Sequence, residues 1–153
     1  MTYLEILIDL RKIIRSINLE SKKIEKDFGI SIQQLLCLQF LQNQPDYQSN
    51  AAAIKAYLQL NASTVSGILA RLENKTLVVR LPKASDKRVT KLTLTAKGAE
   101  LLRNIPPTLE EKLSLKIQQL STEKRLMLKN NLALLVALLD AEQIEPLDEG
   151  SFI

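Results

Sequence analysis

Apolar residues recur at helical spacing along the first part of the chain. From Tyr3 onward they fall three or four positions apart as far as Phe28, and Gly29 follows. This pattern predicts one long amphipathic helix that ends near Gly29. A second apolar helix is predicted to start at Ser31, which can act as its N-cap, and to end before Pro45.

The middle of the chain combines short helices with short strands. Ser49 or Asn50 can cap a helix over the segment AAAIKAYL, and a turn at 59–61 leads into a helix over residues 62–74. The apolar run 77–81 predicts a strand, and a charged loop, 82–90, separates it from a return strand in which apolar and polar residues alternate. Two helices at a tight turn followed by a hairpin are the layout of a winged helix.

The C-terminal part is again helical. Thr95 can cap a helix, which the pair Pro106-Pro107 must kink or restart. The last helix is predicted to begin near Ser121, and its segment 126–139 is apolar almost all round, so we expect it to be buried on more than one side. The tail, 143–153, is acidic.

Composition adds a fold class and a compartment. Of 153 residues, 46% are apolar and 4% aromatic, with four glycines and five prolines. This balance suits helices joined by short turns and argues against an all-β fold. Together with the pattern along the chain, it makes the expected fold mainly α, an α+β winged helix with long N- and C-terminal helices. A single cysteine excludes an internal disulfide, and neither a signal peptide nor a membrane span is apparent. We therefore expect a cytoplasmic protein with no membrane partner.

Charge is concentrated in the middle of the chain. The net charge is +4, but residues 50–103 contain ten basic and three acidic residues, a local balance of +7. The remainder is slightly acidic. Such asymmetry is expected when one segment faces a polyanion, and it makes double-stranded DNA the expected partner.

The helix over 62–74 supplies candidate contacts to the major groove. Its apolar residues Val65, Ile68, Leu69 and Leu72 are predicted to form a buried stripe that leaves the candidate residues within the helix largely outside it. Its first turns carry small and hydroxyl side chains that fit the groove and bind phosphates or base edges. A helix start rich in Ser and Thr is also what a simple N-cap requires. The candidates for DNA binding are Asn61, Ser63, Thr64, Ser66, Gly67 and Arg71.

The charged loop 82–90 supplies candidate contacts to the minor groove. An arginine at the tip of a β-ribbon suits the negative potential there, and a nearby aspartate can orient its guanidinium group. A solvated hairpin tip with no partner is the alternative. The candidates are Lys83, Asp86, Lys87 and Arg88.

Catalytic and metal sites are not expected. The chain has no histidine, and its carboxylates show no ligand spacing for Ca²⁺ or Zn²⁺. Cys37 lies in an apolar helix, which indicates an inert core thiol rather than a redox switch. We expect neither an enzyme nor a bound cofactor.

Several segments resemble the multiple-antibiotic-resistance regulator (MarR) family of winged-helix transcription factors. They are TVSGILARLENK, LVVRL, SDKRVTKLTLTAKG and the closing leucine-rich helices. The third is the most specific, because Asp86, Arg88, Leu92, Leu94, Thr95 and Gly98 reproduce the family pattern D-x-R-x-x-x-L-x-L-T-x-x-G. The resemblance covers essentially the whole chain.

The resemblance implies a homodimeric repressor built as one MarR-type chain, 1–153. Residues 1–30 and 105–142 would form the dimerisation helices and 31–104 the DNA-binding domain. The recognition helix, 62–74, would occupy the major groove and the wing, 82–90, the minor groove. Family members often bind small aromatic or phenolic effectors, between the dimerisation helices and the winged helix.

The chain departs from the family at one turn. Family members often have glycine after the recognition helix, in a pattern like E-K-K-G, where this chain has Glu73-Asn74-Lys75-Thr76. We expect Asn74 or Lys75 to take the left-handed conformation instead, Asn being the better suited.

A winged-helix module that binds another protein without touching DNA is the alternative function.

Overall fold

The computed structural model describes residues 2–82 and 90–140, which belong to two compact units. The described part of the first unit ends at Pro106, and that of the second begins at Pro107. The first unit contains, in order, α1 (Tyr3–Phe28), α2 (Ile32–Gln42), a short 3₁₀ turn η1 (Pro45–Tyr47), β1 (Gln48–Asn50), α3 (Ala51–Leu58), α4 (Ala62–Asn74), β2 (Val78–Arg80), β3 (Lys91–Leu94) and α5 (Ala96–Asn104). The second contains α6 (Leu109–Gln118) and α7 (Thr122–Leu138).

Polar side chains start the helices where the sequence predicts. Each of these caps accepts a hydrogen bond from a backbone N–H in the first turn, which satisfies a donor that the helix itself cannot. Gly29, with φ of 72°, ends α1 in the left-handed conformation. The predicted caps that make this bond are Ser31, Asn50, Thr95 and Ser121.

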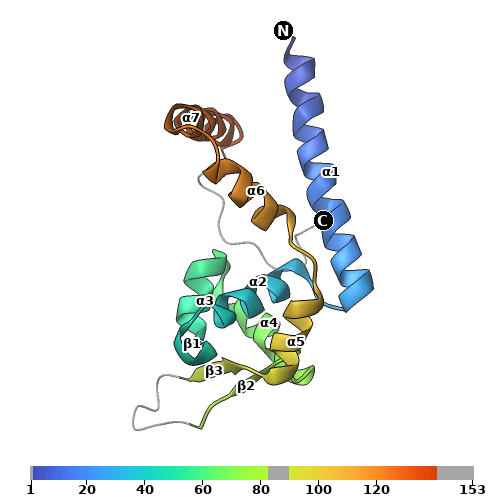
Figure 1. Cartoon of the computed structure of the whole chain (residues 1–153), viewed down its shortest axis with the longest axis vertical. Coiled ribbons are helices and arrows are strands. Elements are labelled where there is room, and N and C mark those ends of the chain that lie inside the picture. The colour runs from blue at the N-terminus through green and yellow to red at the C-terminus, as the bar shows by residue number, and fades with distance from the viewer. Residues whose placement is uncertain (1, 83–89, 141–153) are drawn as a thin grey trace. The chain divides into compact units, whose positions relative to one another are not determined.

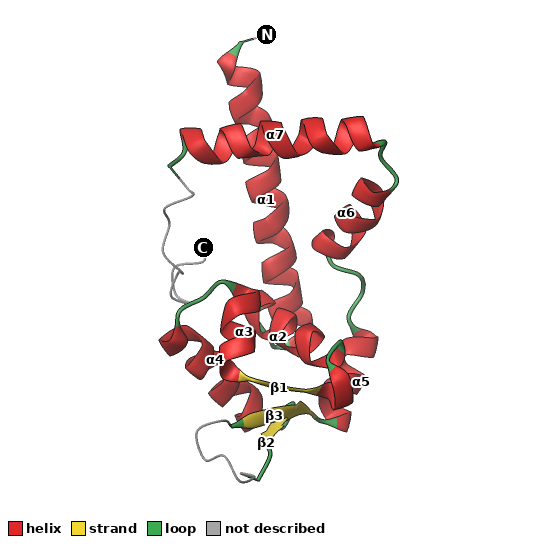
Figure 2. Ribbon diagram, turned by 90° about the vertical axis from the view of Figure 1, so that its left-hand side faces the viewer, coloured by secondary structure: helices red, strands yellow, loops and turns green. Residues whose placement is uncertain are grey.

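A small antiparallel sheet lies beside the helices of the first unit (Figure 1). Its strand order is β1-β3-β2, with Ser49 opposite Leu92 on one side and Val79 opposite Thr93 on the other. The hairpin of β2 and β3 was predicted, but β1 was not, since Gln48–Asn50 has no alternating apolar pattern. Figure 2 shows the three strands side by side.

The core of the first unit is built from aliphatic side chains of every helix except α5 and from the two hairpin strands. Leu92 and Leu94 are buried while Lys91 is exposed, so the predicted alternation in the return strand is confirmed. The least exposed side chains are Ile30, Leu35, Cys37, Leu38, Leu41, Ile54, Val65, Ile68, Leu69, Leu72, Val78 and Leu92.

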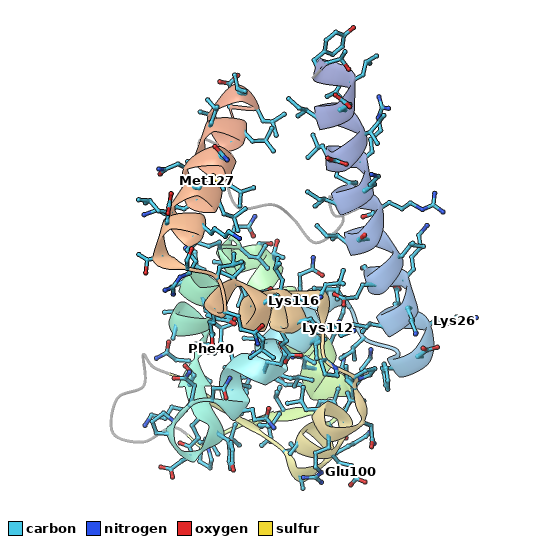
Figure 3. The ribbon with its side chains drawn as sticks, turned by 45° about the horizontal axis from the view of Figure 1, so that its top comes forward. Lys26, Phe40, Glu100, Lys112, Lys116 and Met127 are labelled. Atoms are coloured by element: carbon cyan, nitrogen blue, oxygen red, sulfur yellow. The ribbon has the colours of Figure 1, made fainter. Side chains whose placement is uncertain are left out.

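The boundary between the two units falls within the proline pair, which separates α5 from α6 as predicted. The side chain of Thr108 caps α6 and Glu111 returns a bond to the Thr108 backbone, forming a capping box that was not predicted. No residue of α7 is buried within the chain, and Met127 stands out from this helix in Figure 3. The expectation that α7 is buried on several sides is thus not met inside one chain.

Candidate nucleic-acid interface

A tight turn between α3 and α4 creates the helix-turn-helix. Gln59 ends α3 in the left-handed conformation, with φ of 56°, and its side-chain amide donates to the carbonyl of Ala56 (2.7 Å). Asn61 Oδ1 then accepts a hydrogen bond from the backbone N–H of Thr64 (2.8 Å). The side-chain oxygen of Asn61 therefore caps α4, and its position at the start of this helix is fixed.

The two faces of α4 divide as predicted, with one exception. Val65, Ile68, Leu69 and Leu72 are buried, whereas Ser63, Ser66 and Arg71 are exposed and Gly67 is half-buried. Thr64 is only 6% exposed, although we expected it outside the buried stripe. It follows Ser63 by about 100° around the helix, which turns it toward Val65 and Ile68.

Gly67 and Arg71 lie one helical turn apart on the exposed side of α4. A Cβ atom placed on Gly67 would lie 3.6 Å from Nη1 of Arg71, so the guanidinium group folds back along the helix over the glycine. At Gly67, therefore, only the Arg71 side chain lies over the exposed backbone of the helix. A planar group with five N–H donors is thereby held near the middle of the exposed face.

Two further basic residues, which belong to the basic segment 50–103 but are not among the predicted DNA contacts, lie beside α4. Lys55 of α3 and Arg80 of β2 line a hollow of about 350 Å³ together with Ser66. Arg80 Nε lies 2.5 Å from Oε1 of Glu73, an ion pair whose geometry is that of a charge contact rather than a hydrogen bond. The positive charge of Arg80 thus offsets the negative charge of Glu73, the one acidic residue of α4, near this surface.

The predicted wing candidates Lys83, Asp86, Lys87 and Arg88 lie outside the described residues. The strands on either side of them are described. The ladder of β2 and β3 continues one step beyond β2, where the backbone N–H of Leu81 donates to the carbonyl of Lys91 (2.9 Å).

The end of α4 differs from the prediction. Lys75 has φ of −86°, and the left-handed residue is Thr76, with φ of 59°. The hydroxyl of Thr95 lies 2.7 Å from the Thr76 carbonyl oxygen, and Nζ of Lys97 donates to Oγ1 of Thr76 (3.3 Å). These contacts from the start of α5 fix the turn at Thr76, against the local preference for Asn74.

Catalytic chemistry gains no support from the described residues. They contain no cluster of three or more His, Cys, Asp or Glu side chains that could hold a metal ion. Cys37 is fully buried, and this burial raises the pKa of its thiol to about 12. Among the same residues, no helix combines the length and apolar character that crossing a bilayer requires.

Sequence comparison relates the chain to known regulators. The model of the MarR family matches residues 28–89. The HTH-type transcriptional regulator FarR of Neisseria gonorrhoeae is 40% identical over 78 residues, which are 51% of this chain and 53% of FarR, so the match spans about half of that relative. The HTH-type transcriptional regulator MhqR of Bacillus subtilis is 28% identical over 121 residues, covering 79% of this chain and 82% of MhqR.

Solved structures of the family share the fold. The S. aureus MepR–DNA complex matches 91% of this chain and 99% of MepR, with a TM-score of 0.66 and 27% identity. Sco3205 of Streptomyces coelicolor, a MarR family regulator, has also been solved with DNA. The match covers 89% of this chain and 88% of the Sco3205 chain, with a TM-score of 0.65. At 24% identity it shows a likeness of fold. The chain is thus similar to MarR-family winged-helix transcriptional regulators, in sequence over residues 28–89 and in fold over most of its length.

Proposed function

We propose that the protein is a sequence-specific DNA-binding repressor that acts as a homodimer. The observation that carries this proposal is the exposed face of α4, which presents small residues and Arg71, with Lys55 and Arg80 lining a hollow beside Ser66. Small side chains let a helix enter the major groove, and the basic residues around it attract phosphates. MepR and Sco3205, which share the fold, have been solved with DNA.

Within this proposal, each predicted contact has a distinct role. Ser63, Ser66 and Arg71 read the major groove from α4, and Gly67 allows close approach of the helix backbone. Asn61 positions the helix by capping it, and buried Thr64 supports it from within. In the wing, Arg88 enters the minor groove and is oriented by Asp86, while Lys83 and Lys87 contact phosphates.

The exposed apolar side chains support a dimer. Most of the large apolar residues that remain exposed lie on α1, α6 and α7, including Ile13 (52%), Leu134 (60%) and Leu138 (72%). Many exposed large apolar side chains on one helix mark an interaction site, and a second copy of the chain is the partner that the family suggests. Repression follows if the bound dimer sterically blocks transcription. A small aromatic or phenolic effector would modulate the affinity of the dimer for DNA.

The proposal is tested by selecting bound fragments from random duplex DNA and measuring affinity against salt. A dimer should select a palindrome with half-sites about one helical turn apart. Its log affinity should fall with log salt with a slope of about −0.9 per phosphate contact. A flat salt dependence, or no binding to any duplex at low salt, would contradict DNA binding and favour a module that binds protein.

Single substitutions test the assigned contacts. Arg71→Ala and Arg88→Ala should each weaken binding to the selected site by about 1–3 kcal/mol, with the dimer intact by sedimentation. Lys55→Gln should weaken selected and random duplexes alike and reduce the salt slope by about one. Lys22→Gln, which removes an exposed lysine of α1, is the matched control and should change neither.

A further inference from the structure

The exposed face of α4 over residues 62–71 has few side chains that can tell one base from another. A base edge in the major groove is read best by paired hydrogen bonds, for which an arginine suits guanine, an amide suits adenine and a carboxylate suits cytosine. A serine hydroxyl both donates and accepts, so it fits several bases. Among these positions, therefore, only Arg71 can form a pair of hydrogen bonds to a single base. The exposed and half-buried residues are Ala62, Ser63, Ser66, Gly67, Ala70 and Arg71.

Two asparagines lie at the ends of α4, away from the middle of this face. Oδ1 of Asn61 accepts the hydrogen bond from the backbone N–H of Thr64 (2.8 Å) and serves as the N-cap. Asn74 is the last residue of the helix, about 10 Å along its axis from Gly67. The residues that contact base edges lie toward the N-terminus of a recognition helix. Neither amide is thus placed to read an adenine from the middle of α4.

The one acidic residue of α4 is engaged by a neighbouring strand. Nε of Arg80, in β2, lies 2.5 Å from Oε1 of Glu73. A pair between Glu73 and a cytosine would require this ion pair to break. Arg71 and Glu73 are the only charged residues of α4, so the charge that the helix presents on its exposed face is that of Arg71.

The guanidinium group of Arg71 lies one turn nearer the start of α4 than its own backbone does. A Cβ atom on Gly67 would lie 3.6 Å from Nη1 of Arg71, and long side chains of a helix lean toward its N-terminus. One turn is about 6 Å along the axis. Because Gly67 has no side chain, the guanidinium group has room to lie over the helix there. Its N–H donors are thereby brought toward the part of the helix that contacts base edges.

We infer that Arg71 reads one guanine in each half-site of the DNA, by donating two hydrogen bonds to N7 and O6 of that base. This inference rests on the proposed DNA binding and adds the identity of the base. The remaining exposed residues of α4 over 62–71 offer methyl groups, hydroxyl groups and a glycine. Neighbouring positions of the half-site should therefore discriminate less between bases than the guanine position does. A contact from Arg71 to phosphate, the competing role, would anchor the protein on any sequence alike.

The test compares the full-length protein with Arg71→Ala on the selected duplex, where each guanine of one half-site is replaced in turn by 7-deazaguanine. This analogue keeps its pairing with cytosine but has C–H in place of the acceptor N7, which lies in the major groove. At the guanine that Arg71 reads, the replacement should weaken wild-type binding about three- to tenfold. A complete bidentate pair favours its base by about 5- to 150-fold, and one of its two acceptors is lost. Arg71→Ala should bind both duplexes equally.

Two further variants complete the test. Arg103→Ala removes an exposed arginine of α5 by the same change and should keep the full wild-type loss on 7-deazaguanine. Arg71→Gln should lose the preference for guanine at the position read and favour adenine, with which glutamine forms a bidentate pair. Guanine preference retained in Arg71→Gln would overturn the inference.

The outcomes distinguish the inference from the function on which it rests. If the wild type loses no affinity at any 7-deazaguanine, or if Arg71→Ala loses as much as the wild type at each one, Arg71 does not read guanine although the protein binds DNA. Equal weakening of selected and random duplexes by Arg71→Ala would assign the residue to phosphate and overturn the inference in the same way. Absence of binding to any duplex at low salt would instead refute the proposed function, and the inference with it.

Discussion

Replacing Gly67 by alanine should separate folding stability from DNA binding. Gly67 lies in the middle of α4, and a Cβ atom there would meet only Nη1 of Arg71, at 3.6 Å, an ordinary van der Waals distance. Neither steric crowding nor a left-handed backbone requires glycine at this position in the free protein. A glycine inside a helix nevertheless costs about 1 kcal/mol relative to alanine.

We therefore expect Gly67→Ala to stabilise each protomer by about 0.8–1 kcal/mol, since only the helix propensity changes. For a chain of this length that gain corresponds to a rise in Tm of about 2–4 °C. If the backbone of α4 approaches DNA at Gly67, the added methyl group overfills the contact, which costs about 1–3 kcal/mol per site. The DNA affinity should then fall at least about tenfold.

Stability is measured by urea unfolding at one fixed protein concentration, because the proposed dimerisation would make it depend on concentration. DNA affinity is measured by fluorescence anisotropy on the selected duplex. Ala70→Gly calibrates the same helix at an exposed position and should lose about 1 kcal/mol of stability. A loss of stability in Gly67→Ala would refute the helix argument, and unchanged DNA affinity would refute close approach at Gly67.

Three substitutions and one alkylation experiment test the fold around the site. Gly98→Ala should destabilise the protein by about 1–3 kcal/mol in urea unfolding, because its Cβ would overlap the carbonyl oxygen of Leu77. Thr76→Gly should stabilise the protein by about 0.5 kcal/mol. Glycine relieves the left-handed strain of about 1–2 kcal/mol at this residue, which exceeds the entropic cost of glycine in the unfolded chain. Asn74→Gly, inside the helix, should instead destabilise the protein. Burial raises the pKa of the Cys37 thiol to about 12, so the thiolate fraction in the folded protein should be about 10⁻⁴ at pH 8. Cys37 should therefore resist alkylation by iodoacetamide until urea unfolds the chain. Rapid alkylation of Cys37 in the folded protein would contradict this.

Local interactions made the helices of this chain predictable. A capping side chain and the first N–H groups of its helix are three residues apart, as with Ser31 and Gln34 or Asn50 and Ala53, so the sequence alone contains both partners. The buried stripe of α4 was predictable for the same reason, because helical periodicity fixes which residues share a face. That periodicity also identified Ser63, Ser66 and Arg71 as exposed.

Contacts between distant segments were not predictable in this way. Gln48–Asn50 forms a strand because it pairs with β3, more than forty residues later, and not because of its own composition. Arg80 joins the site because β2 brings it back beside α4, where it meets Glu73. The basic count over 50–103 indicated that such residues exist, but their placement depends on the tertiary fold.

The second half of the most specific family pattern, L-x-L-T-x-x-G, has a structural role in this chain. Leu92 and Leu94 are buried in the core, and the hydroxyl of Thr95 accepts from the N–H of Gly98 (3.0 Å) while it lies 3.0 Å from the carbonyl oxygen of Leu77. Gly98 allows α5 to approach that same carbonyl group. These residues attach the return strand to α5 and to the start of β2. The L-x-L-T-x-x-G half of the pattern therefore identifies the fold, and DNA binding has to be argued from the exposed residues of α4 and tested at Arg88.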